Sequence, residues 1–189
     1  MAGADSDRRH VAPGPRIFLL TALLLALVVP SAASAAGGGA LCSARLSSLE
    51  SDVLVSLNVT RAAHGLRSLR ISPGLCIAAR QHSQEMARLG YFAHDSANGG
   101  SFDARIARSY PFGATFMHWA VGENLVWETS GLDASEALRL WMASPEHRQN
   151  ILDPGWTEAG ISAVQAAAAP GVYGGDDVTI ITTDFGSRS

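Results

Sequence analysis

The pattern of hydrophobic and polar residues predicts helices in the first half of the chain. Apolar residues recur at helical spacing at Leu46, Leu49, Val53 and Leu57. We therefore expect a helix from Leu41 to about His64, closed by Gly65. A second helix is expected to begin after Ser72 and end at Gly90. Its inward face carries His82, which we interpret as a hydrogen-bonded packing residue, because a single helical histidine is weak evidence for a ligand.

The second half of the chain changes from helical to strand-like patterns. The capping box Asp133-Ala-Ser-Glu136 predicts the start of a helix, and Ser144-Pro145 ends it and opens a further segment. Before that helix, we expect a Gly-Glu-Asn turn at residues 122–124. Branched residues predict late strands at Thr157–Gln165 and Val178–Phe185. This order favours an α+β domain or a layered α/β/α domain.

Residues 1–35 have the pattern of an export signal. Arg8, Arg9 and Arg16 precede an uncharged apolar run from Ile17 to Val29, and small residues follow at Ala33-Ser34-Ala35. The run is shorter than the roughly 20 residues that a membrane-spanning helix needs. We predict cleavage after Ala35 and a secreted protein, with an uncleaved membrane anchor as the alternative. Residues 36–45 are predicted to be a disordered tail ahead of one folded domain at residues 46–187.

Charge and cysteine content narrow the class of protein. The formal net charge is −3 and the arginines are dispersed, so we expect no nucleic-acid partner. We also expect a monomer. The two cysteines, Cys42 and Cys76, favour one disulfide in an exported chain, closing a loop of about 35 residues and adding roughly 3–4 kcal/mol. A metal pair or free thiols are the alternatives.

Three side chains are candidates for one cleft. They are His94 in a loop, Glu123 in the Gly-Glu-Asn motif, and His147 after Ser144-Pro145. Converging polar groups in a pocket are the default hypothesis for a functional site. We expect four further residues to support this cleft: Asn124, Ser144, Arg148 and Asn150.

The sequence is compatible with several kinds of chemistry in this cleft. Two imidazoles and one carboxylate are a plausible first shell for Zn²⁺ or another divalent metal, and a metal-bound water could then hydrolyse a bond. Alternatively, without a metal, Glu123 accepts hydrogen bonds from both histidines and raises their pKa values. The cleft would then fix the loops or recognise an anionic or polar ligand. A serine nucleophile is not favoured, since the chain lacks the Gly-x-Ser-x-Gly pattern.

Six motifs in order resemble one known family. They are Asn58-x-x-Arg61-x-x-x-Gly65-Leu66, the segment from Leu75 to Met86, Phe92-x-His94-x-Ser96, Gly122-Glu-Asn124, the segment from Trp141 to Leu152, and Gly160-Ile161. This order is similar to the CAP superfamily, which includes cysteine-rich secretory proteins, venom antigen 5 and plant pathogenesis-related proteins. The chain is similar to the bacterial secreted branch of this superfamily, the SCP-like extracellular proteins. The resemblance runs from about Leu46 to Phe185.

The resemblance implies an α/β/α sandwich around a three-stranded antiparallel sheet. It also implies a surface cleft with a His/Glu/Glu/His tetrad, of which His94, Glu123 and His147 match three members. The fourth position falls on Ser144, which has no carboxylate, and we expect the nearby Glu146 to point elsewhere. This departure weighs against mechanisms that need two paired carboxylates.

On this resemblance we expect a secreted binding module rather than an enzyme. Its ligand would be small and apolar or lipid-like, or an extracellular or cell-wall partner. Two alternatives remain open at this point. One is a Zn²⁺-dependent hydrolase that uses His94, Glu123 and His147, and the other is a structural protein of the cell envelope.

Overall fold

The computed structural model describes residues 46–112, 118–129 and 131–189. The elements are α1 (Ser48–Ala63), β1 (Arg70–Ile71), α2 (Pro73–Leu89), α3 (Phe102–Ala107), β2 (Trp119–Glu128), α4 (Ala134–Ala143), α5 (Pro145–Ile151), β3 (Glu158–Ala166), the 3-10 turn η1 (Gly171–Tyr173) and β4 (Val178–Arg188). No helix in this described part has the length and apolar character needed to span a membrane.

Three sequence predictions fall on residues outside the described ranges. These are the signal peptide at residues 1–35, the disordered tail at residues 36–45 and the Cys42 half of the disulfide. Cys76 lies in α2 and is fully buried. The pairing of Cys42 with Cys76 therefore stays a prediction.

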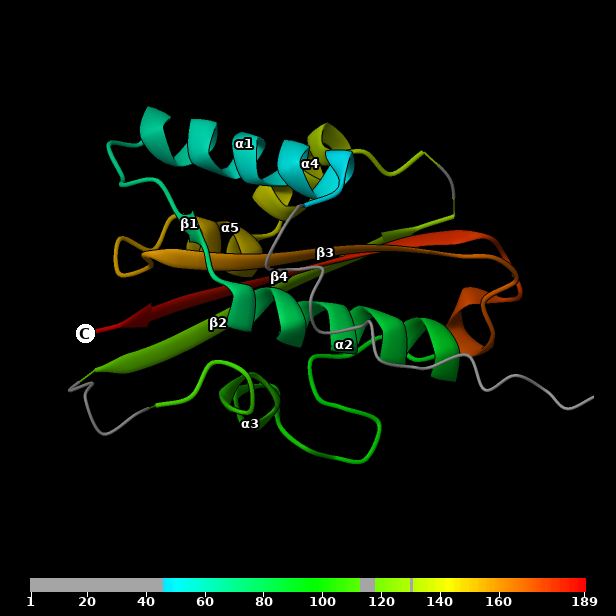
Figure 1. Ribbon diagram of the computed structural model, residues 1–189. Helices are drawn as coiled ribbons and strands as arrows, with labels where there is room; N and C mark the ends of the chain where they lie inside the picture. The colour runs from blue at the N-terminus through cyan, green and yellow to red at the C-terminus, as the bar shows by residue number, and fades with distance from the viewer. Residues whose placement is uncertain (1–45, 113–117, 130) are drawn as a thin grey trace, which may run out of the picture. The chain divides into compact units, whose positions relative to one another are not determined.

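A four-stranded sheet lies between two layers of helices. Its strand order is β1-β3-β4-β2, with antiparallel pairing except between β1 and β3, which are parallel. Figure 1 shows α1, α4 and α5 on one face of the sheet and α2 and α3 on the other. The predicted α+β class and the α/β/α layering are confirmed. The short parallel strand β1 adds to the three antiparallel strands that the resemblance implied.

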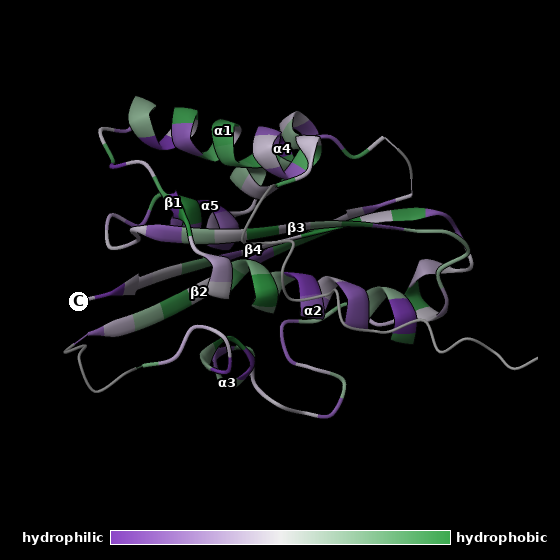
Figure 2. Ribbon diagram, viewed as in Figure 1, coloured by the Kyte–Doolittle hydropathy of each residue, from purple (hydrophilic) through white to green (hydrophobic). Residues whose placement is uncertain are grey.

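Hydrophobic clusters bury both faces of the sheet. On one face, Val53 of α1 and Trp141 of α4 pack with Ile181 and Phe185 of β4. On the other face, Met86 of α2 packs with Leu125 of β2 and Ile180 of β4. Figure 2 shows hydrophobic stretches along the strands between the helical layers. Alternate residues of each strand therefore face opposite helical layers, as the pleat of a strand requires.

The first helix begins later than the sequence pattern predicted. α1 starts at Ser48 because Ser47 and Glu50 form a reciprocal capping box, with the Ser47 side chain accepting from the Glu50 backbone N–H. The capping prediction for α4 is confirmed, since the Asp133 side chain accepts from the Glu136 backbone N–H at 2.8 Å.

The Gly-Glu-Asn motif is not a turn. Residues 122–124 lie within β2, where Glu123 pairs with Asp184 of β4. The turn prediction was wrong because the polar residues of the motif hide the alternation of a strand whose partner is distant in sequence. Gly122 permits close packing at this point of the strand: a Cβ there would lie 2.6 Å from Asn150 Oδ1 and 2.9 Å from the Trp156 ring.

Arg61 ties α1 to the segment that follows α5. Its side chain is fully buried and donates to four backbone carbonyls, those of Arg67, Ile151, Asp153 and Trp156. Asn58, one turn earlier, exchanges hydrogen bonds with the backbone of Leu69 at 3.2 and 2.7 Å. Both residues thus fix the first helix to neighbouring loops. The chain after α5 forms one wall of the cavity described next.

Candidate functional site

One cavity brings the three predicted cleft residues together. His94, Glu123 and His147 all line a cavity of about 290 Å³. The other lining residues are also polar: Asn124, Glu146, Gln149, Asn150 and Asp153. Three segments far apart in sequence therefore meet here: the loop after α2, strand β2, and α5 with the residues that follow it.

Because successive side chains of β2 point to opposite faces of the sheet, this strand contributes cavity residues on the sides of both helical layers. The Glu123 side chain faces the α2 and α3 layer, where it meets His94 and Arg105. Asn124 faces the opposite layer, where its Nδ2 donates to the His147 carbonyl at 3.1 Å. His94 and His147 therefore reach the cavity from different sides of the sheet.

Side chains from the helices satisfy the backbone at the outer edge of β2. Asn150 Nδ2 donates to the Glu123 carbonyl at 3.2 Å and to Asn124 Oδ1 at 3.0 Å. Trp141 Nε1 donates to the Leu125 carbonyl at 3.0 Å. These bonds occupy carbonyls that an edge strand would otherwise leave open, and they fix α4 and α5 against the strand that carries Glu123. Asn124 and Asn150, which were expected to support the cleft, line the cavity and are bonded to each other at this edge.

Glu123 is a buried carboxylate with both oxygens held. Its side chain is 1 % exposed, and Oε1 accepts from His94 Nδ1 at 2.8 Å. Oε2 accepts from Arg105 Nη2 at 2.5 Å. Burial alone would raise the pKa of Glu123, but the hydrogen bond from His94 and the charge of Arg105 outweigh it and lower that pKa. Glu123 is accordingly ionised at neutral pH.

The two cleft histidines have opposite electrostatic surroundings. The hydrogen bond to Glu123 raises the pKa of His94, against the opposing effect of partial burial. Burial, followed by repulsion from His94, lowers the pKa of His147. Since Glu123 engages Nδ1 of His94, Nε2 remains as the ring nitrogen that can meet a ligand. The cavity thus offers one imidazole that favours its cationic form and one that favours its neutral form.

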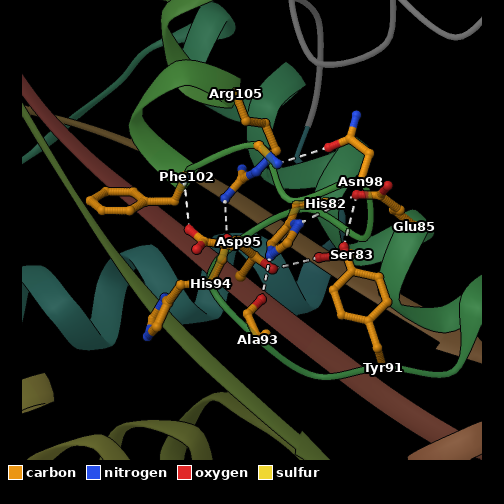
Figure 3. Close-up of polar contacts among 12 residues, drawn as sticks. His82, Ser83, Glu85, Tyr91, Ala93, His94, Asp95, Asn98, Phe102 and Arg105 are labelled. Atoms are coloured by element: carbon orange, nitrogen blue, oxygen red, sulfur yellow. Dashed lines mark hydrogen bonds and ion pairs between the residues drawn. The ribbon is translucent and has the colours of Figure 1, made fainter.

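His82 of α2 supports the loop that carries His94. It is fully buried in α2, and its Nε2–H donates to the Ala93 carbonyl at 2.8 Å, next to His94. Figure 3 shows Ala93, His94 and Arg105 gathered around His82. Its interpretation as a hydrogen-bonded packing residue is confirmed. Burial lowers the pKa of His82, so the neutral ring occupies this position.

The predicted three-residue zinc shell does not fit this geometry. Neither oxygen of Glu123 is available for a metal, since His94 and Arg105 hold one each. The Arg105 charge beside Glu123 also opposes a second cation at that carboxylate. Across the described ranges, no group of three or more His, Cys, Asp or Glu side chains is arranged to hold a metal ion. Glu123 orients His94 instead of joining it as a ligand.

Several residues lie differently from the sequence expectation. Ser144 is the N-cap residue of α5 and Arg148 is exposed, and neither lines the cavity. Glu146, which was expected to point elsewhere, does line it. The sequence reasoning missed Arg105, because one arginine in a six-residue helix carries no pattern. It also missed Asp184, although a carboxylate inside a run of branched strand residues was a signal for it.

The Glu123→Gln variant should lower the pKa of His94, because the charged hydrogen-bond partner is lost while partial burial remains. Histidine ring-proton NMR over a pH series measures this. In the wild type, the raised pKa means that the His94–Glu123 pair contributes stability below the ordinary histidine pKa. That contribution is lost as pH rises through the raised value.

Glu146→Gln is the matched control for this titration. It removes another cavity carboxylate, one whose charge raises the pKa of His147, so it should shift His147 and leave His94 unchanged. An unchanged His94 titration in Glu123→Gln would contradict the described pairing.

Curated relatives of this chain are bacterial. It is 33% identical over 124 residues to the protein YkwD of Bacillus subtilis, covering 65% of this chain and 45% of that protein. It is 30% identical over 112 residues to the membrane protein YlbC of the same organism, covering 59% of this chain and 30% of that protein. The chain thus spans less than half the length of each of these relatives.

Solved structures show the same fold. An extracellular protein of Bacillus anthracis that contains an SCP domain matches with a TM-score of 0.55 and 28% identity, over 72% of this chain and 39% of that chain. An outer surface protein of Borrelia burgdorferi matches with a TM-score of 0.58 and 17% identity, over 74% of this chain and 95% of that chain. At that identity the second likeness concerns the fold alone.

The family comparison agrees with the fold and with the order of motifs. Residues 54–176 match the family described as "CAP: Cysteine-rich secretory protein family". This match covers most of the folded part of the chain and includes His94, Glu123 and His147. The chain therefore belongs to the CAP family of cysteine-rich secretory proteins, in the bacterial branch of SCP-domain proteins.

Proposed function

We propose that this protein is a secreted, non-enzymatic binding module whose cleft takes a small polar ligand. The observation that carries the proposal is the lining of the cavity, in which all eight described residues are polar or ionisable. A ligand there would exchange its hydration for hydrogen bonds to imidazole, amide and carboxylate groups. A lipid-like ligand would gain little, since such ligands need an apolar lining.

His94 would be the main recognition residue of this cleft. Its side chain is half exposed, while the Glu123 that orients it is buried. Because Nδ1 is engaged, Nε2 is presented to the cavity in a fixed direction, which reduces the entropic cost of binding. His147 on the opposite wall would supply a neutral imidazole that can donate or accept.

The lining also supports binding over covalent catalysis. Among the residues that the structure describes, it includes no serine, threonine, cysteine or lysine side chain that could attack a substrate. A carboxylate that fixes an imidazole is shared with catalytic sites, but here the second partner of the carboxylate is a buried arginine. We therefore place the cleft among recognition sites. Substrate turnover that is abolished by His147→Ala would indicate a hydrolase instead.

A lipid-like ligand is the second candidate, and another cavity favours it. This cavity has a volume of about 390 Å³ and lies between α2 and the segment joining β3 to η1. Four alanines, Val164 and Pro170 form most of its lining, with Gln84 and Arg88 beside them. The apolar ligand expected from the family resemblance would fit this cavity better than the His94 cleft.

A ligand-observed NMR screen distinguishes the two candidates. Polar fragments and short-chain fatty acids are tested against the protein purified from the medium of cells that express the full chain. The proposal predicts polar hits that His147→Ala abolishes and that Ala167→Trp, in the apolar cavity, leaves unchanged. Fatty-acid hits abolished only by Ala167→Trp would favour the second candidate. No hits of either kind would favour a structural role in the cell envelope.

A further inference from the structure

Asp184 is a buried carboxyl group that the cleft chemistry described so far does not use. It lies in β4 and is 0 % exposed, and neither of its oxygens accepts a hydrogen bond from the described residues. Burying an unpaired carboxylate costs several kcal/mol. A group this costly inside the core calls for an explanation.

Asp184 lies next to Glu123, on the strand that pairs with β2. In the antiparallel pairing of β2 with β4, Asp184 is the cross-strand partner of Glu123, so the two side chains share one face of the sheet. Arg105 lies between them: Nη2 contacts Glu123 Oε2, and Nη1 is 3.7 Å from Asp184 Oδ2. Two buried carboxyl groups thus share one guanidinium.

The charges of Arg105, Glu123 and Asp184 balance when one proton is bound to Asp184. Glu123 is held ionised by His94 and Arg105. The His94 side chain is half exposed, so water screens its charge, and Glu123 already matches the charge of the buried guanidinium. The other titratable ring packed nearby, His82 of α2, is neutral because burial lowers its pKa. An ionised Asp184 would add a second negative charge to a buried site with one arginine. Burial and then the Glu123 charge raise the pKa of Asp184 well above its usual range, outweighing the opposite effect of Arg105.

We propose that Asp184 is a positioning residue for the cleft, which as a neutral carboxylic acid donates a hydrogen bond to Glu123 and holds that carboxylate toward His94. Glu123 then accepts three hydrogen bonds, from His94 in the loop after α2, from Arg105 on α3 and from Asp184 on β4. The third donor reduces the charge that Glu123 presents to His94. Asp184 thereby tunes the imidazole that meets the ligand without reaching the cavity itself. This inference is independent of which ligand binds.

Two substitutions of Asp184 test the proposal through the NMR titration of His94. Asp184→Asn retains a neutral donor toward Glu123, so the pKa of His94 should stay unchanged. Asp184→Leu removes the donor, so Glu123 should become more basic and the pKa of His94 should rise. Thr183→Val is the control, because Thr183 is also buried with an unpaired hydroxyl but faces the opposite layer. It should leave His94 unchanged.

Other patterns of results would overturn the proposal. If Asp184 were ionised, both variants would remove a negative charge and lower the pKa of His94. If Asp184 were only a packing residue, neither variant would shift the pKa of His94. Infrared spectroscopy gives a test that does not depend on the folding of Asp184→Leu. The wild type at neutral pH should show the carbonyl band of a buried carboxylic acid, and Asp184→Asn should lose it. A wild type without that band would contradict the proposal.

Discussion

Arg61→Ala is expected to lower the free energy of unfolding by about 3–5 kcal/mol, one of the largest effects of any single substitution in the chain. The side chain is fully buried and donates to four carbonyls, one of them 6 residues and three of them 90 to 95 residues after Arg61 in the sequence. Its removal leaves those carbonyls without a donor and opens a space between α1 and the segment after α5. Urea denaturation measures the loss.

Arg67→Ala is the matched control for Arg61. Arg67 lies in the connection after α1, its side chain is exposed, and Arg61 contacts only its backbone carbonyl. Arg67→Ala should change the unfolding free energy by less than about 0.5 kcal/mol. Arg61→Lys should recover only part of the stability, since an ammonium group cannot reach four carbonyls as a planar guanidinium does. A loss below about 1 kcal/mol in Arg61→Ala would show that water replaces these bonds.

Arg105→Met should cost a similar amount, about 3–5 kcal/mol, for an electrostatic reason. It removes the cation beside two buried carboxyl groups, Glu123 and Asp184, and leaves the Glu123 charge without its buried counter-ion. The pKa of Glu123 should rise in the variant, because the Arg105 charge lowers it in the wild type. The stability deficit should therefore shrink as pH falls and Glu123 takes up a proton.

A double variant separates the loss of this charge pair from the loss of packing. In Arg105→Met/Glu123→Gln no buried charge is left behind, so the double variant should be more stable than Arg105→Met alone. Arg108→Met, an exposed arginine at the end of the same helix, should be nearly neutral. Equal stability of the single and double variants would mean that Arg105 acts through packing alone.

Local sequence patterns predicted the helices well because their signals are local. The apolar spacing from Leu49 to Leu57 identifies α1, and the Asp133 capping box identifies the start of α4. Strand β2 was missed at Gly122–Asn124 because its pairing partner, β4, lies about 60 residues later. No local pattern states that pairing. The family motifs nevertheless identified His94, Glu123 and His147 as residues that meet in one cavity.

What the sequence could not supply was the partner of each cleft residue. Glu123 was expected to serve as a ligand or to bridge both histidines, but in the structure it engages only His94, with Arg105 on its other oxygen. That outcome depends on how α3 packs against β2, which is a tertiary property. The same packing decides that Asp184 lies behind Glu123 and that Asn150 satisfies the edge of β2.

The most direct test of the proposed function is to map where the strongest polar hit binds. Amide NMR spectra of the ¹⁵N-labelled protein are recorded as that fragment is added, and the shifted signals are assigned to residues. Binding in the cleft predicts the largest shifts at His94, Glu123, Asn124, His147 and Asn150, with none in the His94→Ala/His147→Ala double variant. Shifts confined to the apolar cavity around Arg88 and Ala167 would contradict the proposal that the histidine cleft is the binding site.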